Sequence, residues 1–342
     1  MLQVKNNTAI SPSISLFPNE QGVDTLYIVL KASFHISPKV SLLDEQIPPI
    51  EEDEYWGEPI VSSLKYASDM HLGKPSTDII LIGNAQTQDQ QECSKLDVEF
   101  QLAQYQQVIT VSGDRHWHKS NISKPLPFVK MPLTYENAYG GLHQFEKKNK
   151  QGEIETITLG EDKNPVGKGF IGKRKSKEVE GLQLPNLEHP EQLIRSIGQA
   201  PEPLCFGFIS PAWIPRRGYA GTYDDVWQKT CAPYLPKDFD KRFFNMAHRT
   251  LSTKAYLEGT EPVRIVNASP IGELNFHLPK NPLEVVINFQ DRTEKPTLFM
   301  ETVQIEPDEN RFSVTWRASV PCDKEALKIK QIDINYLASS QA

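Results

Sequence analysis

Apolar and polar residues alternate in the first part of the chain, a pattern that predicts β-strands. In the stretch LYIVLKASFHI, residues 26–36, every second side chain from the first leucine onward is apolar. A period of two places those side chains on one buried face. The opposite face then carries Lys31, Ser33 and His35. This stretch therefore predicts a strand with one buried side.

Two further stretches, DIILIG from Asp78 and QQVITVSG from Gln106, predict strands by the same reasoning. The first two predicted strands are separated by residues 44–58, which carry seven acids, with prolines within and just after them. Acidic, proline-containing segments are typical of solvated loops. We expect this segment to lie in solvent.

The C-terminal part shows the alternation more clearly. The segments ELNFHLP, LEVVINF and RFSVTWRAS begin at residues 273, 283 and 311. In the last of them, the apolar positions alternate with Arg311, Ser313, Thr315 and Arg317, which we expect on the exposed face. Short strands separated by turn residues predict antiparallel, sandwich-like sheets.

The middle of the chain loses this period of two. In GTYDDVWQKTC, residues 221–231, the aromatic and apolar side chains recur at helical spacing. The segment PKDFDKRFFNMAHRTL, residues 236–251, has the same spacing, and Asp238 precedes Arg242 by four residues, as in a helix-stabilising ion pair. Both segments predict short helices.

These patterns predict a mainly β (α+β) protein with a single elaborated domain over residues 1–342. The strand-rich parts are residues 1–124 and 261–342, and a loop-rich insertion with short helices covers residues 125–260. With 26 prolines, the chain is punctuated too often for long helices.

The composition of the chain excludes several classes of function. The 342 residues are 38% hydrophobic and 24% charged, and the net charge of −7 argues against nucleic acid as the main partner. No apolar run approaches the ~20 residues that span a bilayer, and the start of the chain resembles no leader, so we expect a cytoplasmic protein. The four scattered cysteines predict neither disulfides nor a zinc site.

Three motifs that could carry chemistry are weak. Lys168 lies in NPVGKGF, but the spacing to the preceding glycine and the missing Ser or Thr exclude a phosphate loop. Asp224 and Asp225 are adjacent and point apart, so we expect Thr222 and a first-turn acid to cap a helix. The pair His116 and His118 lacks a third ligand at a fixed spacing, and we expect no metal and no cofactor.

The basic residues between Lys163 and Lys177 number six in an otherwise acidic protein. They are either a solvated loop or a positive surface that attracts an acidic partner. The stretch MPLTYENAYGG, residues 131–141, predicts a single helical turn capped by Thr134. Tyr135 and Tyr139 would then lie on one face, and Gly140 would end the turn. Such a unit favours a rigid corner over a reaction centre.

Five blocks together resemble the family catalogued as domain of unknown function 2169: MPLTYENAYGG, NPVGKGF, LPNLE, RRGYAGTYDDVW and LPKDFDKRFFNMA. They occur in the family's order and cover roughly residues 15 to 310. Members occur in bacterial type VI secretion loci, beside genes for the VgrG spike, its PAAR-type tip and toxic effectors. The resemblance therefore implies a non-enzymatic adaptor or chaperone that loads an effector onto the spike.

The family supplies signature positions but no catalytic residues. These positions are Thr134, Tyr135, Glu136, Gly140, Gly141, Asn164, Pro165, Gly167, Phe170, Trp213, Gly221, Thr222, Tyr223, Asp224, Trp227, Asp238, Asp240, Arg242, Phe243, Phe244 and Asn245.

Interfaces are typically anchored by Tyr, Trp and Arg, in which the middle of this chain is rich. The predicted partner-binding residues are Tyr135, Glu136, Tyr139, Lys168, Arg174, Trp213, Arg216, Arg217, Tyr223 and Trp227. The alternative is that these aromatic side chains pack the protein's own core. The rival function is a hydrolase whose site gathers Glu136, Asp224, Asp240 and a histidine.

Overall fold

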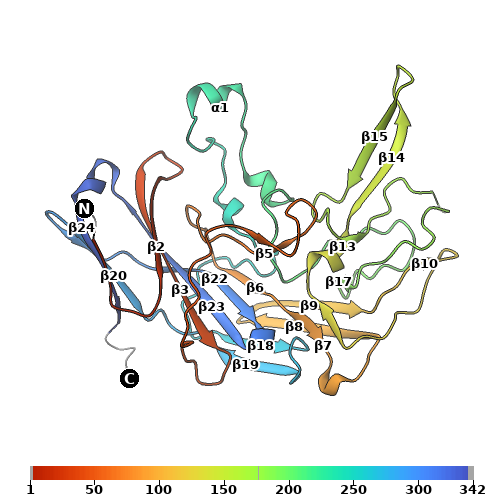
Figure 1. The fold of residues 1–342 in the computed structure, drawn as a ribbon, viewed down its shortest axis with the longest axis horizontal. Coiled ribbons are helices and arrows are strands. Elements are labelled where there is room, and N and C mark those ends of the chain that lie inside the picture. Colours follow the sequence, from red (N-terminus) through yellow and green to blue (C-terminus); the bar gives the residue numbers. More distant parts are fainter. Residues whose placement is uncertain (1–2, 176, 338–342) are drawn as a thin grey trace.

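The computed structural model describes residues 3–175 and 177–337. It is mostly β-structure arranged in several sheets, as the alternation predicted (Figure 1). A five-stranded sheet has the order β2-β3-β23-β22-β6. Its strands are β2 (Pro12–Pro18), β3 (Asp24–His35), β23 (Arg311–Pro321), β22 (Phe299–Glu306) and β6 (Asp78–Leu81). All neighbours in it are antiparallel except β22 and β6.

A second five-stranded sheet has the order β17-β9-β8-β18-β19 and combines strands from residues 95–112, 187–188 and 262–277. Its strands are β17 (Leu187–Glu188), β9 (Tyr105–Ser112), β8 (Lys95–Leu102), β18 (Pro262–Val266) and β19 (Glu273–His277). A four-stranded sheet consists, in order, of β1 (Gln3–Asn6), β24 (Ile329–Tyr336), β20 (Leu283–Phe289) and β21 (Thr293–Glu294).

Apolar faces of these three sheets share one hydrophobic core. On the first sheet, Phe34 stacks on Phe312 of the neighbouring strand, with ring centroids 5.1 Å apart. Phe312 in turn stacks on Phe276 of β19 at 4.9 Å, which joins the two five-stranded sheets. The alternation of β19 and β20 is confirmed, because their side chains are buried at every second position.

The second face of the first sheet corrects the sequence prediction. Lys31 and Ser33 of β3 are buried, as are Ser313, Thr315 and Arg317 of β23, although all five were expected in solvent. The reason is the connection between β3 and β6, whose Asp69 lies against this polar face. The Asp69 carboxylate is 3.2 Å from the Lys31 ammonium and accepts from the Thr315 hydroxyl at 3.3 Å, while Gln46 of the same connection pairs with the Ser33 backbone at the edge of β3. The acidic residues within 44–58 remain largely exposed, as expected.

The remaining β-structure consists of short strand pairs, in the loops of the N-terminal part as well as in the loop-rich middle of the chain. The pairs are β4 (Glu54–Tyr55) with β5 (Leu64–Tyr66), β7 (Asn84–Gln86) with β12 (Lys130–Pro132), β10 (Trp117–His118) with β11 (Asn121–Ile122), β13 (Tyr139–Gly140) with β16 (Lys168–Gly169), and β14 (Leu142–Lys148) with β15 (Ile154–Gly160). The β14–β15 hairpin was missed because its residues are mostly polar.

The α-helix α1 (Asp225–Thr230) and the β14–β15 hairpin project from the same side of the molecule (Figure 1). Short 3-10 turns make up the remaining helical structure: η1 (Gln88–Gln90), η2 (Tyr135–Asn137), η3 (Arg216–Tyr219), η4 (Lys241–Phe244), η5 (Pro307–Glu309) and η6 (Asp323–Lys328). Among the helices of the described residues, none combines the length and apolar character that crossing a bilayer requires. The four cysteines are free.

Candidate functional site

The signature blocks MPLTYENAYGG and NPVGKGF pack against each other in a glycine-dependent junction. β13 and β16 pair in parallel, with Gly140 opposite Gly169. The Asn164 side-chain amide donates to the Tyr135 and Tyr139 carbonyls at 2.8 and 2.9 Å. A Cβ at Gly140 would lie 2.0 Å from the Asn164 carbonyl oxygen, and one at Gly141 would lie 2.6 Å from the Gly167 oxygen. Only glycine permits this backbone contact.

This junction corrects several predictions for the opening stretch. Thr134 stands at the N-cap position of η2, but its side chain makes no capping hydrogen bond. Tyr135 is buried in the main core and Tyr139 in a smaller core beside Trp117, so the two rings do not share one face. Glu136 accepts hydrogen bonds from the Ser63 amide at 2.6 Å and its hydroxyl at 2.8 Å. The stretch is a corner of the scaffold, and its tyrosines are not surface anchors.

Trp213 and Arg216 are also buried, against the prediction that they contact a partner. Trp213 packs edge-on against the Tyr135 ring at 5.4 Å. The Arg216 guanidinium donates to the Ile209 and Phe243 carbonyls at 2.6 and 2.9 Å. Burial lowers the pKa of Arg216 to about 10, which leaves it charged at neutral pH. Both side chains therefore stabilise the fold.

Some side chains of the predicted basic loop form hydrogen bonds within the fold, and others are exposed. Lys168 donates to the Asn186 side chain at 2.8 Å, and Arg174 donates to the Phe170 carbonyl at 2.7 Å, so both hold local structure. Lys173, Lys175 and Lys177 remain exposed. Arg217 is exposed as well and lies 3.5 Å from the carboxylate of Asp162.

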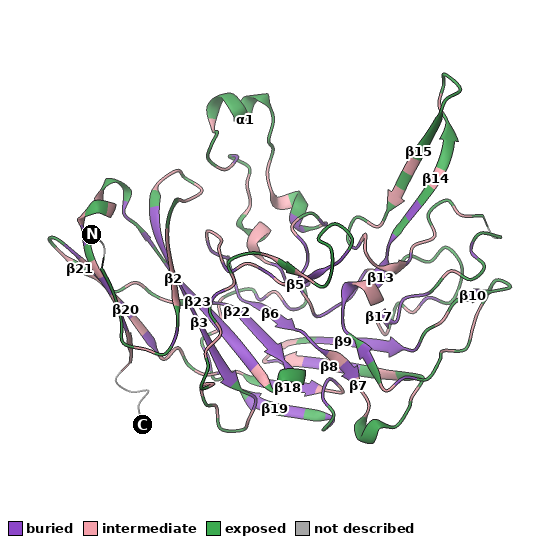
Figure 2. Ribbon diagram, viewed as in Figure 1, coloured by how far each residue is buried: buried purple, intermediate pink, exposed green. Residues whose placement is uncertain are grey.

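Exposed apolar side chains also lie on the α1 lobe, which we define as residues 219–245. Tyr223 and Val226 expose 53% and 65% of their surface. The Trp227 indole is half-buried, donates to the Tyr234 carbonyl at 2.9 Å and meets the Tyr223 ring edge-on at 4.7 Å. Figure 2 shows that the helix of this lobe is largely exposed.

Caps and ion pairs shape the lobe differently from the prediction. Asp224, and not Thr222, caps α1 by accepting from the Trp227 amide at 2.8 Å. Asp238 accepts instead from the Thr222 amide and hydroxyl at 3.0 and 2.8 Å, which fixes the ends of the lobe together beside Gly221. These hydrogen bonds lower the pKa of Asp238, the one from the Thr222 amide most.

The predicted helix over residues 236–251 is wrong, because only the short turn η4 forms there. Asp240 accepts from the Arg242 amide and guanidinium at 2.9 and 2.8 Å, so Arg242 pairs with Asp240 and not with Asp238. This contact lowers the pKa of Asp240, chiefly through the guanidinium. The guanidinium also lies 4.5 Å above the Tyr219 ring.

Two contacts hold the side of the lobe against the body. The Lys241 ammonium lies 2.7 Å from the carboxylate of Glu20, in the turn between β2 and β3. In the same turn, the Tyr234 ring packs over Gly22. The lobe therefore has a fixed side and an exposed side.

The base of the lobe is attached to the first sheet through Asp78 of β6. Its carboxylate accepts from the Asn245 side chain at 2.9 Å and from the Met246 amide at 2.7 Å. The adjacent Phe244 ring stacks on His71 at 5.4 Å. The signature residues Phe244 and Asn245 are thus attachment points.

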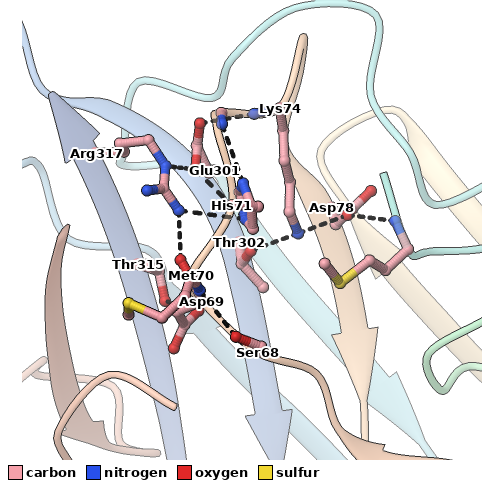
Figure 3. Close-up of polar contacts among 12 residues, drawn as sticks. Ser68, Asp69, Met70, His71, Lys74, Asp78, Glu301, Thr302, Thr315 and Arg317 are labelled. Carbon is pink, nitrogen blue, oxygen red and sulfur yellow. Dashed lines mark hydrogen bonds and ion pairs between the residues drawn. The ribbon is translucent and has the colours of Figure 1, made fainter. Parts of the chain in front are cut away.

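Asp78 belongs to a buried network of three ion pairs. Figure 3 shows the Lys74–Asp78 and Arg317–Glu301 pairs of this network. Lys74 lies 2.7 Å from Asp78 and also donates to the Thr302 hydroxyl at 2.8 Å. The other two pairs are Arg317 with Glu301 at 2.7 Å and Lys31 with Asp69 at 3.2 Å.

The network is closed by backbone groups and a neutral histidine. Arg317 donates to the Asp69 carbonyl at 2.5 Å and lies 3.3 Å from the His71 ring. Glu301 accepts from the Lys74 amide at 2.8 Å. Burial, followed by the charge of Arg317, lowers the pKa of His71 well below its usual value. Paired and hydrogen-bonded, these charges hold the lobe's base rigidly.

This network leaves little trace in the sequence, because its members come from separate strands and a loop. The only signal was Lys31, Thr315 and Arg317 on the polar faces of strands, where an exposed surface was the simpler interpretation. No spacing along the chain brings Asp69 or Glu301 to them.

The residues of the rival hydrolase site engage in separate contacts. Glu136 binds Ser63, Asp224 caps α1 and Asp240 binds Arg242. His118 lies 2.8 Å from Glu180, and His116 is 3.3 Å from the Ser123 hydroxyl. Within residues 3–175 and 177–337, no group of three or more His, Cys, Asp or Glu side chains could hold a metal ion.

Comparison with known proteins places the chain in a family. No curated protein and no solved structure matches it. A family model described as an uncharacterized protein conserved in bacteria (DUF2169) matches residues 21–317, which include the junction, the network and the α1 lobe. The chain therefore belongs to this bacterial family.

Proposed function

We propose that the protein is a non-enzymatic, cytoplasmic adaptor that binds a type VI secretion effector and helps load it onto the VgrG and PAAR spike. The class of partner comes from the resemblance of the signature blocks. The docking surface comes from one observation: the α1 lobe carries exposed apolar side chains on a base fixed by buried charges.

Energetics favour this surface as a docking site. Tyr223 and Val226 expose 53% and 65% of their surface. Fully burying an apolar side chain of this kind contributes roughly 1.5–3 kcal/mol, and tyrosine is enriched among residues that dominate interfaces. The lobe is already fixed at its base by Asp78 and at its side by Lys241, so little ordering cost would oppose binding.

The test is co-expression with the neighbouring effector and PAAR gene products, followed by pull-down and calorimetry. Val226→Asp should weaken effector binding at least tenfold, because it places a charge in an apolar contact worth at least ~1.4 kcal/mol. The matched control is Ile271→Asp, since Ile271 is 73% exposed in the turn between β18 and β19, outside the lobe. It should leave binding unchanged.

Two outcomes would contradict the proposal. One is that the purified proteins form no complex while this protein cleaves a generic ester or glycan, which would favour the hydrolase. The other is that Val226→Asp and Ile271→Asp bind the effector equally well, which would move the docking surface away from α1. Circular dichroism of both variants checks that the fold is intact.

A further inference from the structure

A cavity of about 350 Å³ lies between β9 and three loop segments, and none of its lining residues belongs to the α1 lobe. It is lined by β9 residues 106–108 and by parts of residues 189–192, 202–204 and 248–250. This volume falls within the range of small-molecule sites, about 300–1,000 Å³. Among its lining residues are two histidines, two glutamates and an arginine, so the cavity is polar.

Hydrogen bonds at the back of the cavity fix the tautomer of His248. The Gln107 side-chain amide donates to the Cys205 carbonyl at 2.9 Å, which leaves its oxygen facing Thr250. The Thr250 hydroxyl donates to that oxygen, so its own oxygen is free to accept. It lies 2.8 Å from Nδ1 of His248, so Nδ1 carries the imidazole proton. The Thr250 amide also points toward Nδ1, but at 3.4 Å this contact is longer than a normal N–H hydrogen bond and the shorter contact decides the tautomer. Nε2 is left as an unprotonated acceptor.

Nε2 of His248 has no hydrogen-bond partner among the described residues, although the residue is 93% buried, since its exposed fraction is 7%. Oε1 of the Glu202 carboxylate lies 3.9 Å from Nε2. The other carboxylate oxygen, Oε2, accepts from Arg249 at 2.6 Å, and the Lys163 ammonium is 3.7 Å from Oε1. Burial lowers the pKa of His248 to about 4, so the ring is neutral at pH 7.

Two acceptors at this separation suit one group with two N–H donors. A nitrogen ~2.9 Å from both Nε2 and Oε1 would complete a hydrogen bond to each, within the usual range of N–H donors. A buried acceptor without a partner costs roughly 1–3 kcal/mol, which a bound donor would recover. A hydroxyl group supplies only one donor and could donate to only one of these two acceptors at a time.

We propose that this cavity binds a small ligand through a primary ammonium or carboxamide group, held between Nε2 of His248 and the carboxylate of Glu202. Ligand binding here is independent of the adaptor function: the cavity and the α1 lobe involve different segments, so either assignment can fail alone.

The experiment follows the imidazole ¹⁵N resonances of His248 during titration with butylammonium or butyramide. Butyltrimethylammonium and N,N-dimethylbutyramide are matched ligands that lack the N–H donors. The first two should bind saturably and shift the Nε2 resonance, and the second two should not. His248→Phe and Glu202→Gln should each weaken binding about tenfold, the effect of one lost hydrogen bond of this kind.

Glu202→Gln should weaken butylammonium more than butyramide, because it removes a charge; this arm distinguishes the two ligand classes. His277→Phe, in the exposed part of β19, is the control for a histidine substitution. If His248→Phe does not fold, the ¹⁵N resonances of wild-type His248 and the binding of both ligands to Glu202→Gln still test the proposal.

The proposal is overturned if Nε2 proves to be protonated, if neither donor ligand gives a saturable shift, or if the donor-free ligands bind equally well.

Discussion

Removing the Arg317 guanidinium should expose how the protein's stability depends on its buried charges. In Arg317→Met, the Glu301 carboxylate would stay buried and keep only the hydrogen bond from the Lys74 amide. The Asp69 carbonyl would lose its donor as well. Breaking a buried ion pair by removing one partner costs roughly 3–5 kcal/mol. That is a large part of the ~5–15 kcal/mol by which domains are usually stable.

Adding Glu301→Gln to Arg317→Met should recover part of this loss, because the uncompensated charge disappears while the amide oxygen still accepts from Lys74. We expect a coupling free energy of about 2 kcal/mol between the two positions. The assay is urea unfolding followed by tryptophan fluorescence, with Trp316 next to the altered position. Urea midpoints and slopes of the wild type, both single variants and the double variant complete the cycle.

Arg264→Met is the control. Arg264 lies between Glu99 at 2.8 Å and Glu273 at 3.0 Å on an exposed strand face, where ion pairs contribute little. Equal losses in Arg317→Met and Arg264→Met would refute the reasoning. Strict additivity of the Arg317 and Glu301 substitutions would refute it as well, since it would mean that the two charges do not interact.

Three further predictions follow from the fold. Gly141→Ala should lower the thermal unfolding temperature more than Gly198→Ala. Both glycines have positive φ (107° and 92°), but only at Gly141 would the added Cβ lie 2.6 Å from a backbone oxygen. Equal decreases in unfolding temperature would contradict this reasoning. Acidification from pH 6.5 to 5 should lower the free energy of unfolding of the wild type by up to about 2 kcal/mol through His248. The pKa of His248 is about 4 in the folded protein, below its value in the unfolded chain, so the unfolded chain binds the extra proton in this window. Urea unfolding of His248→Phe should show a flatter pH dependence in that window, and an unchanged slope would argue against a neutral buried ring. If Lys173 and Lys175 attract an acidic partner, reversing their charges should slow effector association in stopped-flow measurements, and salt should slow association of the wild type. An association rate that changes with neither would rule out electrostatic attraction by these two lysines.

The strands at both ends of the chain were predictable because their periodicity records burial. In β20, alternate residues are buried over the whole strand, so the pattern and the structure agree. On β3 the same pattern was incomplete evidence, since Lys31 and Ser33 are polar yet buried, and Lys31 pairs with Asp69 of the connection between β3 and β6. Polar residues on a covered face form hydrogen bonds and ion pairs with residues that are distant in sequence, and such pairs show no periodicity along the chain.

The middle of the chain was predicted less well. Helical spacing over residues 236–251 indicated a helix, but Asp78 takes the Asn245 and Met246 donors and holds that segment extended after a single turn. Tertiary contacts therefore overrode local preference. Of the predicted partner-binding residues, Tyr223 alone combines an aromatic ring with a mostly exposed surface, while four others are core residues.

The glycine-dependent junction has a practical consequence for genetics. Asn164, Gly140 and Gly141 hold two distant segments together through the backbone, so most changes there will lower the amount of folded protein in the cell. A random screen for loss of the proposed adaptor function would return these positions together with residues that contact a partner. Measuring protein abundance alongside partner binding would separate the two classes of mutant.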